Sequence, residues 1–223
     1  MNSNRDTSRL LGAAFLLQAV ASAVSGLFLL QPLIVADSIV DSMTNIANHA
    51  LQMQASIVVE MITAVGIVML GSMLFATLRK QNETMALVGL GLYLMEATIL
   101  AASRMPAFSL LRTSQASVIA GHPAHLQALG NLFYESQSFG YDLHMLPFAL
   151  GATLFYYLFF KSGYLPRVLS IWGLVAAPLA LVGTLFVLSG YDVPLFVFLP
   201  NLPFELGTGI WLVIKGIGDG SDT

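Results

Sequence analysis

Apolar residues dominate six segments of the chain, and polar or charged residues gather between them. A helix that crosses a hydrocarbon core of ~30 Å needs about 20 mostly apolar residues. Each of the six segments is long enough to do so. The pattern therefore predicts an all-α, polytopic membrane bundle with transmembrane helices over about residues 10–32, 56–78, 84–103, 140–160, 168–189 and 194–214.

The first segment shares some features with a secretory signal peptide. Arg5 and Arg9 precede it, and it contains the small residues Ala21-Ser22-Ala23. Its apolar run is much longer than the about 7–15 residues of a signal-peptide core. We therefore expect it to be retained as the first transmembrane helix.

The positions of Lys and Arg predict the orientation of the bundle. Short cytoplasmic loops retain positive charge, whereas outer loops carry little. With a cytoplasmic N-terminus, only Arg104 and Arg112 fall on the outer side. We predict a cytoplasmic N-terminus over residues 1–9, a single membrane domain over 10–216 and a cytoplasmic tail over 217–223. The basic residues expected on the cytoplasmic side are Arg5, Arg9, Arg79, Lys80, Lys161, Arg167 and Lys215.

Composition excludes several classes of protein. The chain is 57% hydrophobic and only 9% charged, whereas a soluble domain carries about 25% charged residues to solvate its surface. The net charge of −3 and the lack of a basic run argue against nucleic-acid binding. The absence of cysteine excludes disulfides, thiolate catalysis and iron–sulfur clusters. An integral membrane protein is the class that remains.

Two outer loops are long. In the first, apolar residues recur at helical spacing opposite polar ones, which predicts a short amphipathic helix lying on the outer membrane surface. The second loop, residues 104–139, is expected to break at Pro106 and at Gly121-His122-Pro123 and to resume as a helix over 124–136. These loops are either binding elements or lids packed on the bundle. The apolar positions of the first are Ile39, Met43, Ile46, Ala50 and Met53.

Ionisable residues within the segments are few. Each costs roughly 2.5–3.5 kcal/mol in a bilayer core, so each is expected to have a partner or a function. At ~1.5 Å of rise per residue they all fall in the outer half of the membrane, with Glu205 deepest, near the midplane. We predict that they line an outward-facing acidic pocket together with Arg104, which could pair with one of the carboxylates. The candidate ligand-binding residues are Glu60, Glu96, Arg104, Asp142, His144 and Glu205.

Other polar side chains accompany these groups at helical spacing. Tyr93 shares a face with Glu96, Ser56 shares one with Glu60, and Gln18 and Ser25 lie on the first segment. Such neighbours satisfy a buried polar network. The same contacts could instead fix helix register without any ligand, and both interpretations stay open.

The sixth segment contains three prolines, Pro194, Pro200 and Pro203. Each proline removes a backbone donor and disturbs the preceding turn. We expect Asn201 to cap a second half-helix that holds Glu205 in its first turns. Discontinuous helices of this kind line binding sites in transporters. The alternative is a proline kink at a packing contact.

Several chemistries do not fit. His122 and His125 have no third ligand nearby, so we expect no metal site, and we expect no cofactor. His144 has no second histidine near the membrane interior, which excludes bis-histidine haem ligation. No nucleotide-binding loop or hydrolase motif is present. Four aromatic residues beside Lys161 are interpreted as an interfacial belt: Tyr156, Tyr157, Phe159 and Phe160.

The C-terminal third contains several distinctive motifs: Phe155-Tyr156-Tyr157-Leu158, Ser162-Gly163-Tyr164-Leu165-Pro166-Arg167, Ile171-Trp172-Gly173-Leu174, and Glu205 followed by Ile210-Trp211-Leu212-Val213-Ile214-Lys215-Gly216. Through these motifs the chain resembles a bacterial six-helix membrane family known as domain of unknown function 4386. The similarity is looser over the first three segments, where Met95-Glu96-Ala97 fits the usual acidic position. The resemblance implies a protein of the bacterial inner membrane and supplies no activity.

Three functions compete, and enzymatic activity stays undecided. The favoured function is binding or translocation of a small amphiphilic or cationic molecule. The second is a noncatalytic membrane partner or sensor subunit. The third is a membrane-embedded acid/base enzyme acting on a lipid or terpenoid, which needs two carboxyls close together. Expected partners are membrane lipid and a small-molecule ligand, with a homo-oligomer or another membrane protein left open.

Overall fold

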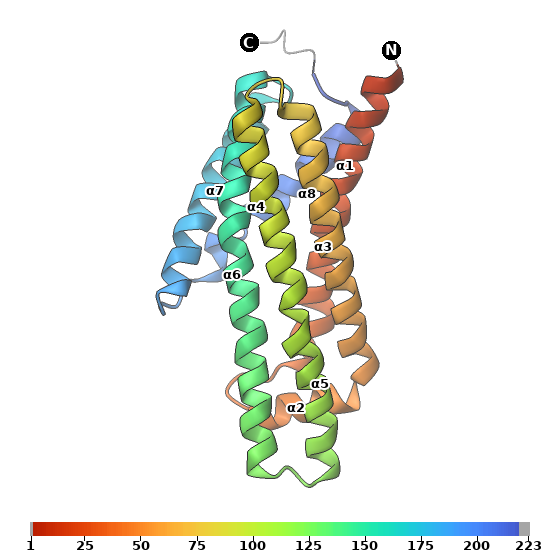
Figure 1. The fold of residues 1–223 in the computed structure, drawn as a ribbon, viewed down its shortest axis with the longest axis vertical. Helices are drawn as coiled ribbons and strands as arrows, with labels where there is room; N and C mark the ends of the chain where they lie inside the picture. Colours follow the sequence, from red (N-terminus) through yellow and green to blue (C-terminus); the bar gives the residue numbers. More distant parts are fainter. Residues whose placement is uncertain (1, 219–223) are drawn as a thin grey trace. The chain divides into compact units, whose positions relative to one another are not determined.

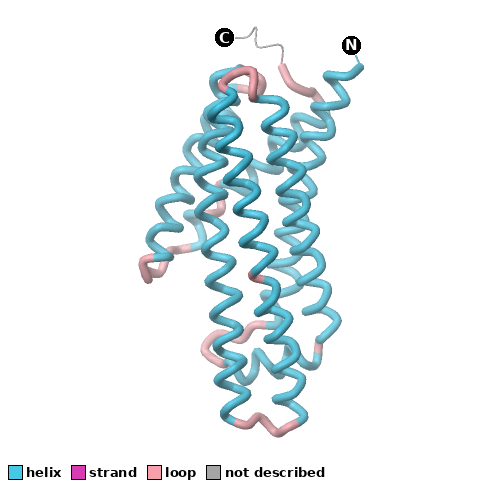
Figure 2. Tube along the Cα trace, viewed as in Figure 1, coloured by secondary structure: helices cyan, strands magenta, loops and turns pink. Residues whose placement is uncertain are grey.

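The computed structural model describes residues 2–218, and every regular element within them is a helix (Figures 1 and 2). A π-helix and two 3₁₀ turns join the α-helices. The α-helices are α1 (Asn2–Ala23), α2 (Ile39–Asn48), α3 (Ala50–Leu78), α4 (Glu83–Ala102), α5 (Arg104–Ile119), α6 (Ala124–Ser162), α7 (Arg167–Leu188) and α8 (Asn201–Ile214). The π-helix is Val24–Leu30, and the 3₁₀ turns are Gln31–Leu33 and Leu195–Val197.

Six helical stretches are long and apolar enough to cross a membrane, as the sequence predicts. Each contains one of the predicted segments or matches it to within a few residues at each end. The chain is therefore an all-α, multi-pass membrane protein. The six spans are Asp6–Leu33, Ala50–Leu78, Glu83–Ile119, Ala124–Ser162, Arg167–Leu188 and Leu195–Ile214.

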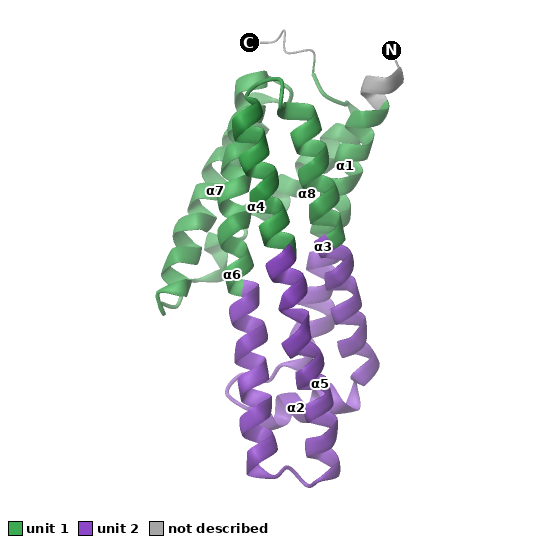
Figure 3. Cartoon of the chain, in the orientation of Figure 1, with its two compact units in different colours: residues 1–19, 65–97, 142–223 green, residues 20–64, 98–141 purple. Residues whose placement is uncertain are grey.

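The chain divides into two compact units (Figure 3). Unit 1 comprises Met1–Ala19, Val65–Ala97 and Asp142–Thr223, and unit 2 comprises Val20–Ala64 and Thr98–Tyr141. Helices α7 and α8 belong to unit 1, whereas α2 and α5 belong to unit 2. Helices α1, α3, α4 and α6 contribute residues to both.

Helix α7 presents the distribution of side chains expected of a lipid-facing helix. Its buried face consists largely of small residues such as Gly173, Ala177 and Gly183. Its opposite face exposes large apolar side chains, including Val168 and Val175. Small residues let helix backbones approach closely in a membrane, where lipid rather than water surrounds the outer face.

Helix α2 corrects the prediction for the first outer loop. It ends at Asn48, so Ala50 and Met53 belong to α3 instead. Its apolar residues Met43 and Ile46 are fully buried, in a core that includes Leu110 of α5. Helix α2 thus buries its apolar face against protein, and its predicted place at the outer membrane surface stays a prediction. Of the two interpretations of this loop, the lid is the one that the packing supports.

The second of the two loops that the sequence predicts on the outer side is a helical hairpin. Pro106 does not interrupt the helix, because it occupies the first turn of α5, where no intrahelical hydrogen bond needs its missing N–H. The turn is at Gly121 and His122, which both have positive φ. Helix α6 then runs for 39 residues, or about 58 Å, nearly twice the ~30 Å of the hydrocarbon core.

The sixth segment is discontinuous, as predicted. Helix α8 begins at Asn201 and has 14 residues, so it is only about 21 Å long. The predicted capping role of Asn201 is wrong, because its side-chain Nδ2 donates to the carbonyls of Ala176 (3.3 Å) and Phe198 (3.4 Å). Trp172 Nε1 donates to the Pro200 carbonyl at 3.0 Å. These bonds fix the start of α8 against α7.

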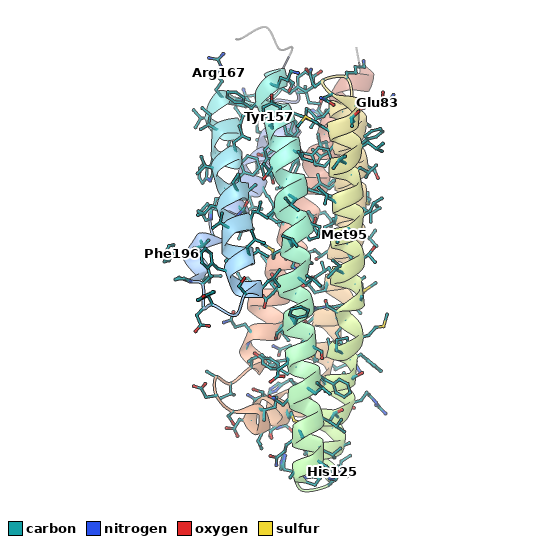
Figure 4. All side chains as sticks on the ribbon, turned by 60° about the vertical axis from the view of Figure 1, so that its left-hand side comes forward. Glu83, Met95, His125, Tyr157, Arg167 and Phe196 are labelled. Atoms are coloured by element: carbon teal, nitrogen blue, oxygen red, sulfur yellow. The ribbon has the colours of Figure 1, made fainter. Side chains whose placement is uncertain are left out.

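One end of unit 1 is closed by backbone contacts between sequence motifs far apart in the chain. The Gly218 N–H donates to the Tyr164 carbonyl (3.1 Å), and the Ile217 N–H donates to Ser8 Oγ (3.3 Å). Gly216 adopts a positive φ of 80° in the turn that makes these contacts. Figure 4 shows Glu83, Tyr157 and Arg167 toward this end. The basic residues at these helix ends are exposed: Arg79, Lys80, Lys161, Arg167 and Lys215.

Helices α1 and α8 cross in close contact at two glycines. A Cβ atom added at Gly12 would lie 2.7 Å from the Gly209 carbonyl oxygen and 2.8 Å from the Val213 nitrogen. Both obstacles are backbone atoms, which cannot rotate away. The contact requires glycine at position 12.

We expect Gly12→Ala to lower the free energy of unfolding by about 1–3 kcal/mol, because overpacking must separate α1 from α8. Gly91→Ala is the matched control, since a Cβ there meets nothing within 4 Å. It should leave stability unchanged or raise it by up to about 1 kcal/mol through helix propensity. Thermal unfolding in detergent measures both, and equal melting temperatures would contradict this packing.

Candidate functional site

Two buried carboxyl groups lie together in unit 1. Glu96 is on α4 and Glu205 is on α8, and their side chains are only 4% and 7% exposed. The two groups interact electrostatically. The structure thus unites two of the six predicted site residues, which come from segments more than 100 positions apart in the sequence.

Two tyrosines complete the centre of this cluster. Tyr93 precedes Glu96 by three residues on α4, and Tyr156 is on α6. Both are buried, and each phenol interacts with the other and with both carboxyl groups. We call Tyr93, Glu96, Tyr156 and Glu205 the carboxyl–phenol cluster.

Glycines make room for the tyrosine rings. A Cβ added at Gly71 or Gly151 would lie 2.9 Å or 2.8 Å from Tyr93 side-chain atoms. At Gly173 it would lie 2.9 Å from Tyr156 and 2.7 Å from the Phe204 ring. At these glycines the backbones of α3, α6 and α7 lie so close to the tyrosine rings that no larger residue fits.

Phenylalanine rings surround the tyrosines. Phe155 meets Tyr93 edge to face with 5.2 Å between ring centroids, and Phe148 lies 6.5 Å from the same ring. The Phe204 centroid is 4.4 Å from that of Tyr156. The polar groups of the cluster are thus surrounded largely by aromatic rings of low polarity.

The polar atoms of the cluster are incompletely hydrogen-bonded. Glu96 Oε2 has no hydrogen-bond partner among the described residues, and the hydroxyls of Tyr93 and Tyr156 interact without a bond of standard geometry. Gln18 on α1 interacts with Glu205. Buried polar groups are nearly always hydrogen-bonded in folded proteins, so these oxygens retain capacity for a further partner.

No Lys or Arg side chain is buried in the described part of unit 1. Each of them is exposed: Arg9, Arg79, Lys80, Lys161, Arg167 and Lys215. The carboxyl–phenol cluster is therefore acidic and has no buried Lys or Arg of its own unit to balance it.

Unit 2 contains a second polar group, and this one includes a cation. Glu60 on α3 and Arg104 on α5 are both buried and attract each other. Arg104 donates from Nε and Nη2 to Ser103 Oγ, at 3.1 Å and 2.8 Å. Glu60 also interacts with Ser25. The sequence left the partner of Arg104 open, and within unit 2 the carboxyl that attracts it is Glu60.

Ser25 reaches this group from the π-helix Val24–Leu30. Its hydroxyl bonds to the Ser56 carbonyl at 3.0 Å and contacts the Ser56 hydroxyl at 3.1 Å. π-Helical turns are rare and occur frequently at functional sites. Here the π-helix contributes a hydroxyl to the polar core of unit 2.

Asp142 and His144 lie where α6 enters unit 1. Asp142 is half-buried and His144 is buried. Within the described residues, no group of three or more His, Asp or Glu side chains could hold a metal ion.

Tyr156 is the member of the cluster that the sequence pattern does not identify. The aromatic run beside Lys161 predicts an interfacial belt, yet Tyr156 and Phe159 are completely buried, and only Tyr157 and Phe160 are exposed. Helical spacing was the available signal, since Tyr156 falls on the same face as the buried Ala149 and Ala152.

The fold and these two polar groups define a multi-pass α-helical membrane protein with an acidic cluster in one unit and a buried group that contains both an acid and a base in the other. The chain belongs to the family described as "Domain of unknown function (DUF4386)", whose model it matches over residues 10–216. No curated protein and no solved structure matches the chain. The family confirms the resemblance seen in the sequence and carries no activity.

Removing one charge of the Glu60–Arg104 pair should be more harmful than removing both. Arg104→Gln leaves a buried carboxylate without its cation, and we expect a loss of about 3–5 kcal/mol in unfolding free energy. Glu60→Gln combined with Arg104→Gln should recover part of that loss. A double-mutant cycle by denaturant titration in detergent measures the coupling.

Arg112→Gln is the control on the same helix, because Arg112 is exposed, and it should change stability by no more than about 0.5 kcal/mol. Additive effects of Glu60→Gln and Arg104→Gln would show that the two charges do not depend on each other.

Proposed function

We propose that this protein binds a small amphiphilic or cationic molecule at the carboxyl–phenol cluster and moves it across the membrane. The observation that carries the proposal is the pair of buried carboxyl groups, Glu96 and Glu205, with no buried Lys or Arg among the described residues of unit 1.

The electrostatics of the cluster favour a positively charged ligand. A buried carboxylate is costly unless it is paired, and two neighbouring carboxylates also repel each other. A cation between Glu96 and Glu205 relieves both penalties. Glu96 Oε2, which lacks a partner among the described residues, and the two phenol oxygens supply oxygen atoms to receive it.

The aromatic surroundings favour an organic cation over a hard metal ion. Calcium takes 6–8 oxygen ligands, and two carboxyls with two phenols offer six at most, and only if both carboxyls bind through both oxygens. The faces of Tyr and Phe rings attract organic ammonium groups through cation–π interactions. Tyr93, Tyr156 and Phe204 provide such rings beside the carboxyls.

The discontinuity before α8 supports movement as well as binding. Glu205 is the fifth residue of this short helix, and an irregular stretch precedes it. In transporters, broken helices of this kind line substrate sites and have backbone groups that rearrange. In this protein the break precedes the carboxyl that α8 contributes to the cluster.

We propose the plasma membrane of a bacterium as the location, with both termini cytoplasmic. The exposed basic residues gathered at one end of unit 1 support this orientation, because cytoplasmic loops retain Lys and Arg. Membrane lipid then surrounds exposed apolar faces such as that of α7.

A second function draws on the same two carboxyls. Because Glu96 and Glu205 lie together, they could act as acid and base on a lipid or terpenoid. Such an enzyme would convert its substrate, whereas a carrier releases it unchanged. Recovery of the bound molecule after incubation, followed by mass spectrometry, separates the two functions.

Neutralising the cluster should weaken cation binding. We expect Glu96→Gln and Glu205→Gln each to reduce the affinity of the purified protein for tetraphenylphosphonium, benzyltrimethylammonium or tetraethylammonium at least about tenfold, since one lost charge interaction of about 1.4 kcal/mol has that effect. Isothermal titration calorimetry in detergent measures the affinities.

Glu83→Gln is the matched control. Glu83 begins the same helix as Glu96 but is exposed, so this variant should bind like the wild type. Unchanged binding by both cluster variants would contradict the proposal and favour a noncatalytic membrane partner or sensor subunit.

The orientation can be tested by labelling, because the chain contains no cysteine. Ala120→Cys places a thiol at the exposed tip of the α5–α6 hairpin, and Lys80→Cys places one in the exposed α3–α4 turn. We expect a membrane-impermeant maleimide added to intact spheroplasts to label Ala120→Cys and not Lys80→Cys. The reverse pattern would overturn the proposed orientation.

A further inference from the structure

The buried carboxyl groups of the carboxyl–phenol cluster need a balancing charge both with and without a ligand. We infer that protons balance Glu96 and Glu205 when no ligand is bound, and that an organic cation displaces one of them, so that the protein exchanges the cation for a proton. This inference rests on the proposed function and adds the ion that moves in the opposite direction.

Before a cation binds, the cluster contains acidic groups and no basic group. The titratable groups that face Glu96 are Glu205 from α8, Tyr93 from its own helix and Tyr156 from α6. None of these groups is a cation, and every described Lys and Arg side chain of unit 1 is exposed. Protons on the carboxyl groups are therefore the balancing charge that the cluster itself can hold.

The exchange itself has to balance in charge. A monovalent cation that enters beside Glu96 and Glu205 is neutralised by one carboxylate, which forms when one carboxylic acid loses its proton to water. The other carboxyl keeps its proton, because two carboxylates beside a single positive charge would leave a net negative charge buried. One cation enters and one proton leaves, so the charge of the site does not change.

The phenols stabilise the carboxylate that the exchange creates. The hydroxyls of Tyr93 and Tyr156 interact with each other without a hydrogen bond of standard geometry, and each also interacts with Glu96 and Glu205. A hydrogen bond to an ionised group is roughly twice as strong as one between neutral groups. The phenols therefore favour the ionised carboxyl once the cation has arrived.

The exchange couples the cation to the proton gradient of the membrane. If the protonated and the cation-loaded cluster are the two states that change access between the membrane faces, protons moving inward drive the organic cation outward. A cluster with neither a proton nor a cation would bury two like charges, so this state is unfavourable and its population is low. A low population of this state prevents the protein from carrying protons or cations in one direction without exchange.

The decisive experiment measures proton release on cation binding to the purified, full-length protein. Benzyltrimethylammonium and tetraphenylphosphonium are suitable probes, because neither carries a titratable proton that would confuse the measurement. In weakly buffered detergent solution with a pH indicator, we expect about one proton released per cation bound. By linkage, the affinity for the cation should then rise with pH, by up to about tenfold per pH unit, over the pH range in which the free cluster still holds the proton that the cation displaces.

Variants assign the proton to the cluster. Each single variant, Glu96→Gln or Glu205→Gln, keeps one carboxyl that can ionise and should still release about one proton per bound cation. The double variant Glu96→Gln/Glu205→Gln should release no protons when the cation is added, whereas the exposed Glu83→Gln should release as many as the wild type. Tyr93→Phe keeps both carboxyls and should retain proton release with weaker binding. The measurement on the wild type stands without any variant, should one of them fail to fold.

The two proposals fail in different ways. Cation binding without proton release, and with an affinity that does not depend on pH, would overturn the exchange and leave the binding function in place. Folded wild-type protein that binds none of the three probes would overturn both. Proton release by the double variant Glu96→Gln/Glu205→Gln that equals that of the wild type would place the exchanging group outside the cluster and overturn the exchange.

Discussion

The structure depends on the cost of holding ionisable groups away from water. In a membrane this cost falls on each buried carboxyl unless a counter-charge, a proton or a hydrogen bond offsets it. The two units of this chain meet it differently. In unit 2 Arg104 balances Glu60, and serine hydroxyls support both. In unit 1 Glu96 and Glu205 have phenols and an amide beside them but no buried Lys or Arg among the described residues, so their balance has to come from protons or from a ligand.

Close helix packing is what brings these groups together. Gly12 and Gly209 let α1 and α8 cross at backbone contact, while Gly71 and Gly151 leave the space that the Tyr93 ring fills. Lipid provides no hydrophobic force between helices, so association relies on such close contacts. The glycines therefore belong to the site as much as its charged residues do, because a larger side chain would move the helices that carry Glu205 and Tyr93.

The sequence was sufficient for the six spans, because an unbroken run of about 20 apolar residues is typical of a membrane-spanning helix and rare elsewhere. It also identified Glu96 and Glu205, since a carboxyl in such a run is conspicuous. It could not show that Glu96 pairs with Glu205 whereas Arg104 pairs with Glu60, because pairing between helices depends on tertiary packing. The sequence did not predict the burial of Tyr156, for a related reason. A buried tyrosine and an interfacial tyrosine can have the same neighbours in sequence, and only the packing of Tyr156 against Gly173 distinguishes them.

The discontinuity before α8 connects the packing with the chemistry. Prolines leave backbone groups in this region without helical partners, and the bonds from Trp172 to the Pro200 carbonyl and from Asn201 to the Ala176 carbonyl satisfy part of that need. These hydrogen bonds to α7, together with the packing of Phe204 against Gly173 and Tyr156, hold the start of the helix that carries Glu205. The same helix therefore carries both an irregular start and one of the two buried carboxyls, so the charge on Glu205 and the position of α8 depend on each other.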